Sequence, residues 1–441
     1  MNHIHSLGRS KMKIFIRNYL PVFLIALGVR VFVWLLIIDH PERALDNDSA
    51  LYISLAQNLL ALHIFPSILR TPIYPLFIAA TSDISVNVLP GVLISQCVLD
   101  SLTAAAVTLI FFRVFENNRY SQVAGLTYAF NPFAVYYANM ILTETLFTFL
   151  FVLMFCFLVF FFRTQKSIYL ASSSIMLGLS TLCRPIALYI PLLILPGLFF
   201  VVKHLKKKII FCALFILCFF AVVVPWHLRN YNRDHRFILS TIDESNYFIS
   251  FAPEVLMIEN NPLSALQVRI NEPIEHYRNL LWSEVKSRYG WREKSPFEVM
   301  NDAQRVALLR EEGEKVILQR PLIFLASHTV NILRTLCPYY PPFSKLTGHD
   351  SRLLPILSFT IDLLTMVCFV LGTFLSLRGE WLLKSNRVLM CIMIAIIFYF
   401  SFIPGIVGYP RFRIPILPYI CILSSMGFRK VLQLAHISGQ D

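Results

Sequence analysis

One stretch decides the fold class of this 441-residue chain: Ile209-Ile-Phe-Cys-Ala-Leu-Phe-Ile-Leu-Cys-Phe-Phe-Ala-Val-Val-Val-Pro-Trp226. It is apolar throughout, and with its flanks it is long enough to cross a bilayer as one helix. The whole chain has the same character, with 56% hydrophobic residues, 15% charged residues and a mean hydropathy of +0.64. Soluble domains carry about 25% charged residues. The composition therefore excludes a cytosolic enzyme, a disordered tail and a secreted disulfide scaffold, and it predicts an all-α polytopic membrane protein.

Nine further apolar runs bring the number of predicted spans to ten. One more segment, Leu322–Cys337, is ambiguous because polar residues interrupt it. We expect it to form an interfacial helix, and an eleventh span is the alternative. The ten predicted spans are Ile14–Ile38, Val86–Phe112, Gln122–Met140, Leu146–Phe162, Ile168–Leu182, Ile186–Val202, Ile209–Trp226, Leu354–Leu377, Val388–Ile403 and Ile414–Phe428.

The net charge of +13 does not indicate a nucleic-acid partner, because the basic residues gather in short clusters between apolar runs. Such clusters mark the cytoplasmic ends of spans. The clusters beside residues 9–17 and 429–430 predict that both termini are cytoplasmic. In this topology the acids lie outside, since 39–85 and 229–319 together hold 19 of the 26 acidic residues.

The chain is predicted to have three parts. An N-terminal transmembrane core, 1–228, contains the first outward loop, 39–85, and begins with a signal-anchor that is retained. An outward cap follows at 229–350, and C-terminal transmembrane helices occupy 351–441. The cap is expected to contain two helices, Glu272–Tyr289 and Pro296–Gln319, which show helical spacing.

The first outward loop carries the candidate catalytic residue. After Asp48, leucines recur at helical spacing at positions 51, 55, 59 and 62, which predicts an amphipathic helix at the outer interface. Asp48 at its start has two interpretations: it caps the helix, or it faces a cavity as a general base. The Asp46-x-Asp48 pair also leaves a divalent metal open as a cofactor.

A second element in this loop is Arg70-Thr-Pro-Ile-Tyr74-Pro. Its prolines hold the chain extended or turned before it re-enters the membrane. Arg70 is either an interfacial arginine that snorkels to the membrane surface or a contact for a phosphate group, which suits a guanidinium fork.

An ordered set of motifs, taken together, resembles the GT-C glycosyltransferases. It is most similar to the family of dolichyl-phosphate-mannose–protein mannosyltransferases (family 39) and its bacterial relatives, such as the lipid A aminoarabinose transferase. Two departures stand out: Leu62-His63 replaces the usual glycine after the first amphipathic helix, and Arg70-Thr-Pro replaces the Lys-Pro-Pro of the aminoarabinose transferase. The motifs are Asp48-x-x-x-Tyr52, Arg70-Thr-Pro-x-Tyr74-Pro, Thr143-Glu144-x-Leu146, Leu182-Cys-Arg184-Pro, Pro225-Trp-x-x-Arg229-Asn and Arg411-x-Arg413.

The resemblance implies a GT-C-like fold and an inverting transfer of one sugar. The donor would be a polyprenyl-phosphate sugar, and the acceptor a hydroxyl of a glycan, lipid or protein on the outer face of a bacterial inner membrane. By position, Asp48 is the general base. Glu144 is expected to be a second carboxylate of the catalytic site, and the alternative is an acid at a helix N-terminus that complements the helix dipole. Cations must stabilise the leaving phosphate; the candidates are Arg70, Arg184, Arg229, Arg411 and Arg413. Asp46, Tyr52 and Tyr74 are expected to line the substrate cavity.

The alternative functions are a transporter or flippase, or a polymerase, of lipid-linked saccharides. Transporters often have repeated halves with broken helices, and the sequence has no such symmetry. A polymerase is not expected to carry the Asp48…Arg70-Thr-Pro pair. Asp100 and Asp362 lie deeper in predicted spans, where we expect them to pair with polar groups on neighbouring helices, such as Arg30.

Overall fold

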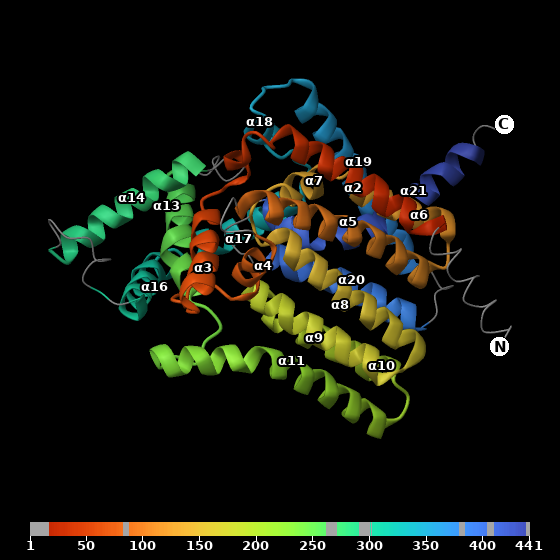
Figure 1. Ribbon diagram of the computed structural model, residues 1–441, viewed down its shortest axis with the longest axis horizontal. Helices are drawn as coiled ribbons and strands as arrows, with labels where there is room; N and C mark the ends of the chain where they lie inside the picture. Colours follow the sequence, from red (N-terminus) through yellow and green to blue (C-terminus); the bar gives the residue numbers. More distant parts are fainter. Residues whose placement is uncertain are drawn as a thin grey trace.

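The computed structural model describes residues 17–82, 88–261, 271–290, 300, 302–378, 384–403 and 410–437, and it is helical throughout these ranges. Long helices form a bundle, and α13, α14 and α16 gather at the end of the bundle where α3 lies (Figure 1). The α-helices are α2 (Leu20–Leu36), α3 (Ser49–Leu62), α4 (Ile73–Thr81), α5 (Val88–Phe115), α6 (Asn118–Ala129), α7 (Pro132–Ala138), α8 (Glu144–Thr164), α9 (Ser167–Cys183), α10 (Pro191–Val201), α11 (Leu205–Asp234), α12 (Ile242–Asn246), α13 (Ala252–Asn260), α14 (Asn271–Arg288), α16 (Asp302–Leu318), α17 (Pro321–Leu336), α18 (Phe343–Thr347), α19 (Leu353–Arg378), α20 (Lys384–Phe402) and α21 (Leu417–Ile437). Short 3-10 or π turns lie at η1 (Pro41–Ala44), η2 (Pro185–Tyr189), η3 (Tyr247–Phe251) and η5 (Pro410–Ile416).

Six of the described helices are long and apolar enough to cross a membrane, or seven if the bent pair α16 and α17 is one span. The all-helical membrane class is thus confirmed, but the predicted number of ten spans is not. Three predicted spans correspond to shorter apolar helices, α2, α9 and η2 with α10.

A fourth predicted span, Gln122–Met140, is broken in two. Helix α6 ends at Ala129 and α7 begins at Pro132. Proline cannot continue a helix past the residue before it, since its ring removes a donor and clashes with the preceding turn. Asn131 caps the new helix by accepting from the Phe133 amide at 3.0 Å. An apolar count does not reveal such a break.

A buried ion pair fills the gap beside this break. Arg30 donates from Nε to Asp100 at 2.6 Å and from Nη1 to the Ala129 carbonyl at 2.6 Å. The Tyr128 hydroxyl donates to the other Asp100 oxygen, also at 2.6 Å. The expectation that Asp100 pairs with Arg30 is confirmed, and the pair also satisfies a carbonyl that the broken helix leaves free.

The ambiguous segment Leu322–Cys337 forms α17, which meets α16 at a sharp corner. The two helices meet at 99°, and α17 exposes Leu322, Leu325 and Leu333 along one side. Whether α17 lies at the interface, as we expect, or completes a bent span stays a prediction. Helix α14 confirms the expected helix at Glu272–Tyr289, and α16 confirms the second expected helix from Asp302 onward; residues 296–299 and 301 lie outside the described ranges.

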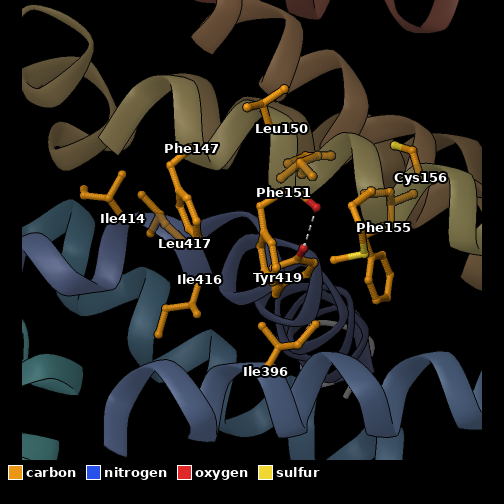
Figure 2. Close-up of a cluster of buried hydrophobic side chains, with 14 of the residues drawn as sticks. Phe147, Leu150, Phe151, Phe155, Cys156, Ile396, Ile414, Ile416, Leu417 and Tyr419 are labelled. Atoms are coloured by element: carbon orange, nitrogen blue, oxygen red, sulfur yellow. Dashed lines mark hydrogen bonds between the residues drawn. The ribbon is translucent and has the colours of Figure 1, made fainter. Parts of the chain in front are cut away.

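An aromatic core lies where α8 packs on η5, α20 and α21. Phe147 and Phe151 stack with ring centroids 5.6 Å apart, and the Tyr419 hydroxyl donates to the Phe151 carbonyl at 3.4 Å (Figure 2). Since α8 begins at Glu144, this rigid layer lies directly below the N-terminal end of α8. The side chains at that end therefore project from a fixed base.

Candidate active site

Asp48 is held between two arginines. One carboxylate oxygen accepts from Arg70 Nη2 at 2.6 Å, and the other accepts from Arg411 Nη2 at 3.0 Å. Asp48 stands at the N-cap position of α3 but makes no side-chain capping hydrogen bond. The capping interpretation is therefore wrong, and the carboxylate is directed into a charged cluster.

Arg411 connects Asp48 to a second carboxylate. Its Nε lies 2.7 Å from Oε1 of Glu144, and Arg184 Nη1 lies 2.7 Å from the same oxygen. Glu144 is fully buried, whereas a quarter of the Asp48 side chain is exposed. The result is a cluster of three guanidinium groups and two carboxylates, which carries one excess positive charge.

Backbone contacts explain why three sequence motifs meet here. The hydroxyl of Thr71 donates to the Cys183 carbonyl at 3.1 Å, which places Arg70 beside Arg184. The Cys183 thiol lies 3.9 Å from the Thr143 carbonyl, next to Glu144. Arg184 precedes Pro185 and is extended, as a residue before proline is expected to be, so it ends α9 and leaves the helix axis.

The start of α3 is fixed to the same region. The Ser49 hydroxyl donates to the Ile141 carbonyl at 2.7 Å, and the Ile141 amide donates to the Ala44 carbonyl at 2.9 Å. At its other end α3 stops at His63, whose φ of 53° is left-handed. A glycine adopts this conformation without steric cost. His63, which stands where the family usually has glycine, forms the same turn with a strained backbone.

Tyr52 supports Arg70 from below. The guanidinium lies over the Tyr52 ring, 5.1 Å from its centroid, and Arg70 Nη1 donates to the Tyr52 hydroxyl at 3.2 Å. Tyr74 packs edge-on behind Tyr52 at 5.1 Å and donates to Gln96 at 2.8 Å. Tyr74 therefore does not line the cavity as predicted: it braces Tyr52 from a fully buried position.

A cavity of about 2100 Å³ opens over the cluster. The predicted residues Asp46, Asp48, Tyr52, Arg70, Arg184 and Arg411 all line it. Side chains from the α12–α16 region, which sequence reasoning did not single out, form its other end. Among them are Asp243, Glu244, Tyr247, Glu275, Arg278 and Trp282.

Two of the five predicted phosphate-binding arginines lie elsewhere. Arg229 donates to the Ser67 and Phe65 carbonyls and stacks 4.7 Å from the Trp226 ring, so it holds the loop before Arg70. Arg413 is 1% exposed and donates to Asp362 at 2.8 Å. The expectation that Asp362 has a polar partner is confirmed. Neither arginine lines the cavity, because Arg229 is engaged by backbone carbonyls and Arg413 by the buried carboxylate of Asp362.

The ionisation of Asp48 follows from its surroundings. Burial alone would raise the pKa of this carboxyl, but the guanidinium groups of Arg70 and Arg411 outweigh burial and hold the pKa below its ordinary value. Burial raises the pKa of Tyr52, so this phenol stays neutral under Arg70. Asp48 is therefore an anion over the whole neutral range.

The cluster keeps donors in reserve. Arg70 Nε is buried and has no hydrogen-bond acceptor within the described part of the chain, whereas Arg184 Nη1 and Arg411 Nε share the single oxygen Oε1 of Glu144. Unsatisfied charged donors are costly to bury. Three converging guanidiniums suit an anion with several oxygens, above all a phosphate.

A divalent metal fits this site poorly. Asp48 already has two cationic partners, and Asp46 faces Lys345 at 3.6 Å. Among the residues that the structure describes, no three His, Cys, Asp or Glu side chains are grouped to hold an ion.

Comparison with solved structures shows that the chain shares its fold with an archaeal oligosaccharyltransferase. The oligosaccharyltransferase AglB from Archaeoglobus fulgidus, in complex with an inhibitory peptide and a dolichol-phosphate, matches 97% of this chain with a TM-score of 0.55 and 16% identity. A second structure of the Archaeoglobus fulgidus oligosaccharyltransferase, tethered to an acceptor peptide, matches 96% with a TM-score of 0.57 and 15% identity. This chain covers only 52% and 51% of those chains, about half their length.

Comparison of sequences confirms the predicted family resemblance. Residues 69–226 match the model of the dolichyl-phosphate-mannose-protein mannosyltransferase family, a segment that contains Arg70, Glu144 and Arg184. Among the solved structures, ArnT from Cupriavidus metallidurans bound to undecaprenyl phosphate matches 95% of this chain and 79% of its own, with a TM-score of 0.40 and 12% identity. No curated protein matches the chain significantly.

Proposed function

We propose that this protein is a membrane glycosyltransferase that moves a sugar from a polyprenyl-phosphate donor to an acceptor hydroxyl. The observation that carries this proposal is the cluster of Arg70, Arg184 and Arg411 around Asp48, at the bottom of a large cavity. It combines an anion site with a carboxylate base. The family resemblance of residues 69–226 supports the same assignment.

The donor phosphate takes the place of Asp48 on the arginines. In the structure the carboxylate occupies Nη2 of both Arg70 and Arg411. A phosphate carries more charge and more acceptor oxygens than a carboxylate, so it competes effectively for these donors and for the buried Nε of Arg70. Asp48 is then released toward the acceptor, and its pKa rises because two cations have turned to the phosphate.

Transfer is a single displacement at the anomeric carbon. The acceptor oxygen forms a bond to that carbon, while the bond from the carbon to the phosphate oxygen breaks and its electron pair stays on the polyprenyl phosphate. Asp48 takes the proton of the acceptor hydroxyl. The arginines stabilise the charge that grows on the leaving oxygen. Attack opposite to the leaving group inverts the anomeric configuration.

Glu144 acts as a positioning residue in this proposal. It is fully buried behind the cluster, does not line the cavity and touches both Arg184 and Arg411. Its role is to hold these two guanidiniums in a fixed orientation so that they need no reorganisation when the phosphate arrives. The reaction is placed on the outer face of a bacterial inner membrane, with both termini in the cytoplasm, in accordance with the charge bias of the sequence.

The test uses the purified full chain in nanodiscs with a panel of undecaprenyl-phosphate-linked monosaccharides. We expect release of undecaprenyl phosphate from at least one of them, and loss of release in Asp48→Asn by about 10²-fold or more. The thermal melting curve of the variant should stay cooperative. Wild-type turnover by Asp48→Asn, or no release from any donor, would overturn the proposal.

A further inference from the structure

The cavity over Asp48 is larger than a donor headgroup requires. Pockets for small ligands usually measure about 300–1,000 Å³, and this one reaches about 2100 Å³. Its inner end is the arginine cluster. Its outer end is formed by α12, η3, α14 and α16, with Asp243, Tyr247 and Trp282 among the lining residues. A second ligand fits beside the donor.

The outer end is tied to the loop that carries Arg70. The Ser240 hydroxyl donates to the Leu69 carbonyl at 2.6 Å, and the Thr241 amide donates to the Ile68 carbonyl at 3.1 Å. The Trp226 indole donates to the Leu239 carbonyl at 2.9 Å. Residues 239–241 lead directly into α12, so the first turn of α12 has a fixed position relative to the arginine cluster.

Asp243 on this turn is a carboxylate without a counterion. Its side chain is accessible in the cavity and has no hydrogen bond or ion pair to any described residue. Its neighbour Glu244, in contrast, accepts both ends of a bidentate pair from Arg236 at 2.7 and 2.9 Å. The surrounding protein and the charge of Glu244 raise the pKa of Asp243, although its side chain stays exposed to the cavity.

We propose that the outer end of the cavity is an acceptor subsite for a saccharide, and that Asp243 is the residue that recognises it. This inference rests on the proposed function, because Asp48 is reserved for the hydroxyl that reacts. The two oxygens of Asp243 accept hydrogen bonds from neighbouring hydroxyls of the sugar ring. Tyr247 and Trp282 line the same end, and their rings cover the apolar faces of a sugar.

The chemistry favours a saccharide over a serine or threonine peptide. A peptide would present its one hydroxyl to Asp48 and would offer Asp243 single backbone amides spaced along an extended chain. A carboxylate with two free oxygens is better matched by two donors on neighbouring atoms. A sugar supplies further hydroxyls at the spacing of one ring, whether it is free, part of a polymer or attached to a lipid.

Loss of Asp243, the proposed recognition residue, should change different kinetic constants from loss of Asp48, the proposed base. Asp243→Asn should weaken saccharide binding and raise the acceptor KM by about tenfold or more, since hydrogen bonds to a charged group are lost. The affinity for undecaprenyl phosphate and the slow hydrolysis of the lipid-linked donor by water should change less than about twofold, because neither needs the acceptor.

The experiment measures binding of free methyl glycosides and disaccharides to the full chain in nanodiscs by saturation-transfer NMR, and transfer to the same sugars by mass spectrometry. Glu284→Gln is the matched control, because Glu284 is also an exposed carboxylate of the cap, on α14, but does not line the cavity. We expect loss in Asp243→Asn, little change in Glu284→Gln and partial recovery in Asp243→Glu. Asp243→Ser replaces Asp243→Asn if the latter does not melt cooperatively.

Three results would overturn the acceptor subsite: no sugar in the panel binds the wild type, both variants lose binding equally, or only a serine peptide binds in an Asp243-dependent way. The binding measurement needs no turnover. If no lipid-linked donor is consumed but sugars still bind through Asp243, the proposed function fails while the saccharide site stands.

Discussion

Arg411 and Asp48 lie 3.0 Å apart although 362 residues separate them in the sequence. The contact joins the first loop of the chain to η5, which begins the last helical segment. Since Arg70 holds the other Asp48 oxygen, the proposed base and the proposed phosphate site share the same guanidinium groups. A donor phosphate that binds as proposed must compete with the protein's own carboxylate.

This competition predicts that a variant without the base binds the donor lipid more tightly. In Asp48→Asn the arginines lose their internal anion, and the affinity for undecaprenyl phosphate should rise about tenfold. Isothermal titration calorimetry of the full chain in nanodiscs measures this directly.

Asp46→Asn is the control for this measurement. It removes the same charge from the same cavity, but Asp46 faces Lys345 rather than the arginine cluster. Its affinity for undecaprenyl phosphate should change by less than about threefold, since the charge is distant and partly screened. Equal gains in the two variants would point to general electrostatics and against an exchange of Asp48 for phosphate.

The shared arginines also predict two different acid limits in the pH–rate profiles. In the free enzyme the arginines hold the pKa of Asp48 below its ordinary value, so kcat/KM should fall only at a pH below the ordinary range of aspartate. With donor bound, phosphate engages the arginines and the pKa rises, so kcat should fall at a higher pH. Coincident limits, measured with a saturating and a limiting donor, would contradict the exchange.

The sequence predicted the central cluster because its motifs are local. Arg184 stands between the end of α9 and Pro185, and Arg70 lies in the loop two residues before Pro72, the N-cap of α4. Both side chains therefore leave from helix ends rather than from helix interiors. Arg413 could not be separated from Arg411 in this way. The two are a single residue apart in a 3-10 turn, yet one reaches Asp48 and the other Asp362, a difference that only tertiary packing decides.

Other features of the structure could not be predicted from the sequence. The break at Asn131 and Pro132 lies inside an apolar run, and only the buried Arg30 that satisfies the Ala129 carbonyl makes it stable. Asp243 is one of fourteen acids in a polar segment, so composition does not distinguish it. Its place in the cavity depends on the contacts of residues 239–241 with the loop before Arg70.

The Arg30–Asp100 pair should be structural only. Arg30→Met leaves a buried carboxylate without its counterion and should destabilise the protein by about 3–5 kcal/mol. The double variant Arg30→Met/Asp100→Leu should recover most of this loss, because no uncompensated charge remains. Thermal melting in nanodiscs measures both, and the turnover per folded molecule should equal that of the wild type. A double variant as unstable as the single one would show that the hydrogen bonds to Tyr128 and Ala129, not the charges, dominate.

Glu254 should make stability depend on pH. Burial raises its pKa to about 7, although Asn331 and Arg334 on α17 lower it. A carboxyl whose folded pKa is raised favours the folded state below the unfolded value of about 4.5 and loses that contribution as pH rises through about 7. The melting temperature should therefore fall between about pH 5 and pH 8. Glu254→Gln should flatten this slope, and an unchanged slope would exclude Glu254 as its source.

A bound phosphate should make up for the loss of the Glu144 charge. Glu144→Gln leaves Arg184 and Arg411 facing each other with Asp48 as their remaining counterion, so the melting temperature should fall by an amount equivalent to about 3–5 kcal/mol. Undecaprenyl phosphate restores negative charge at the same guanidiniums, so it should raise the melting temperature of the variant more than that of the wild type.

Glu312→Gln is the matched control for Glu144→Gln: Glu312 is also buried and paired, with Arg288 and Lys315, but far along the chain in α16. It should lose stability without any added rescue by the lipid. Equal rescue of both variants, or of neither, would mean that Glu144 does not orient the phosphate-binding arginines.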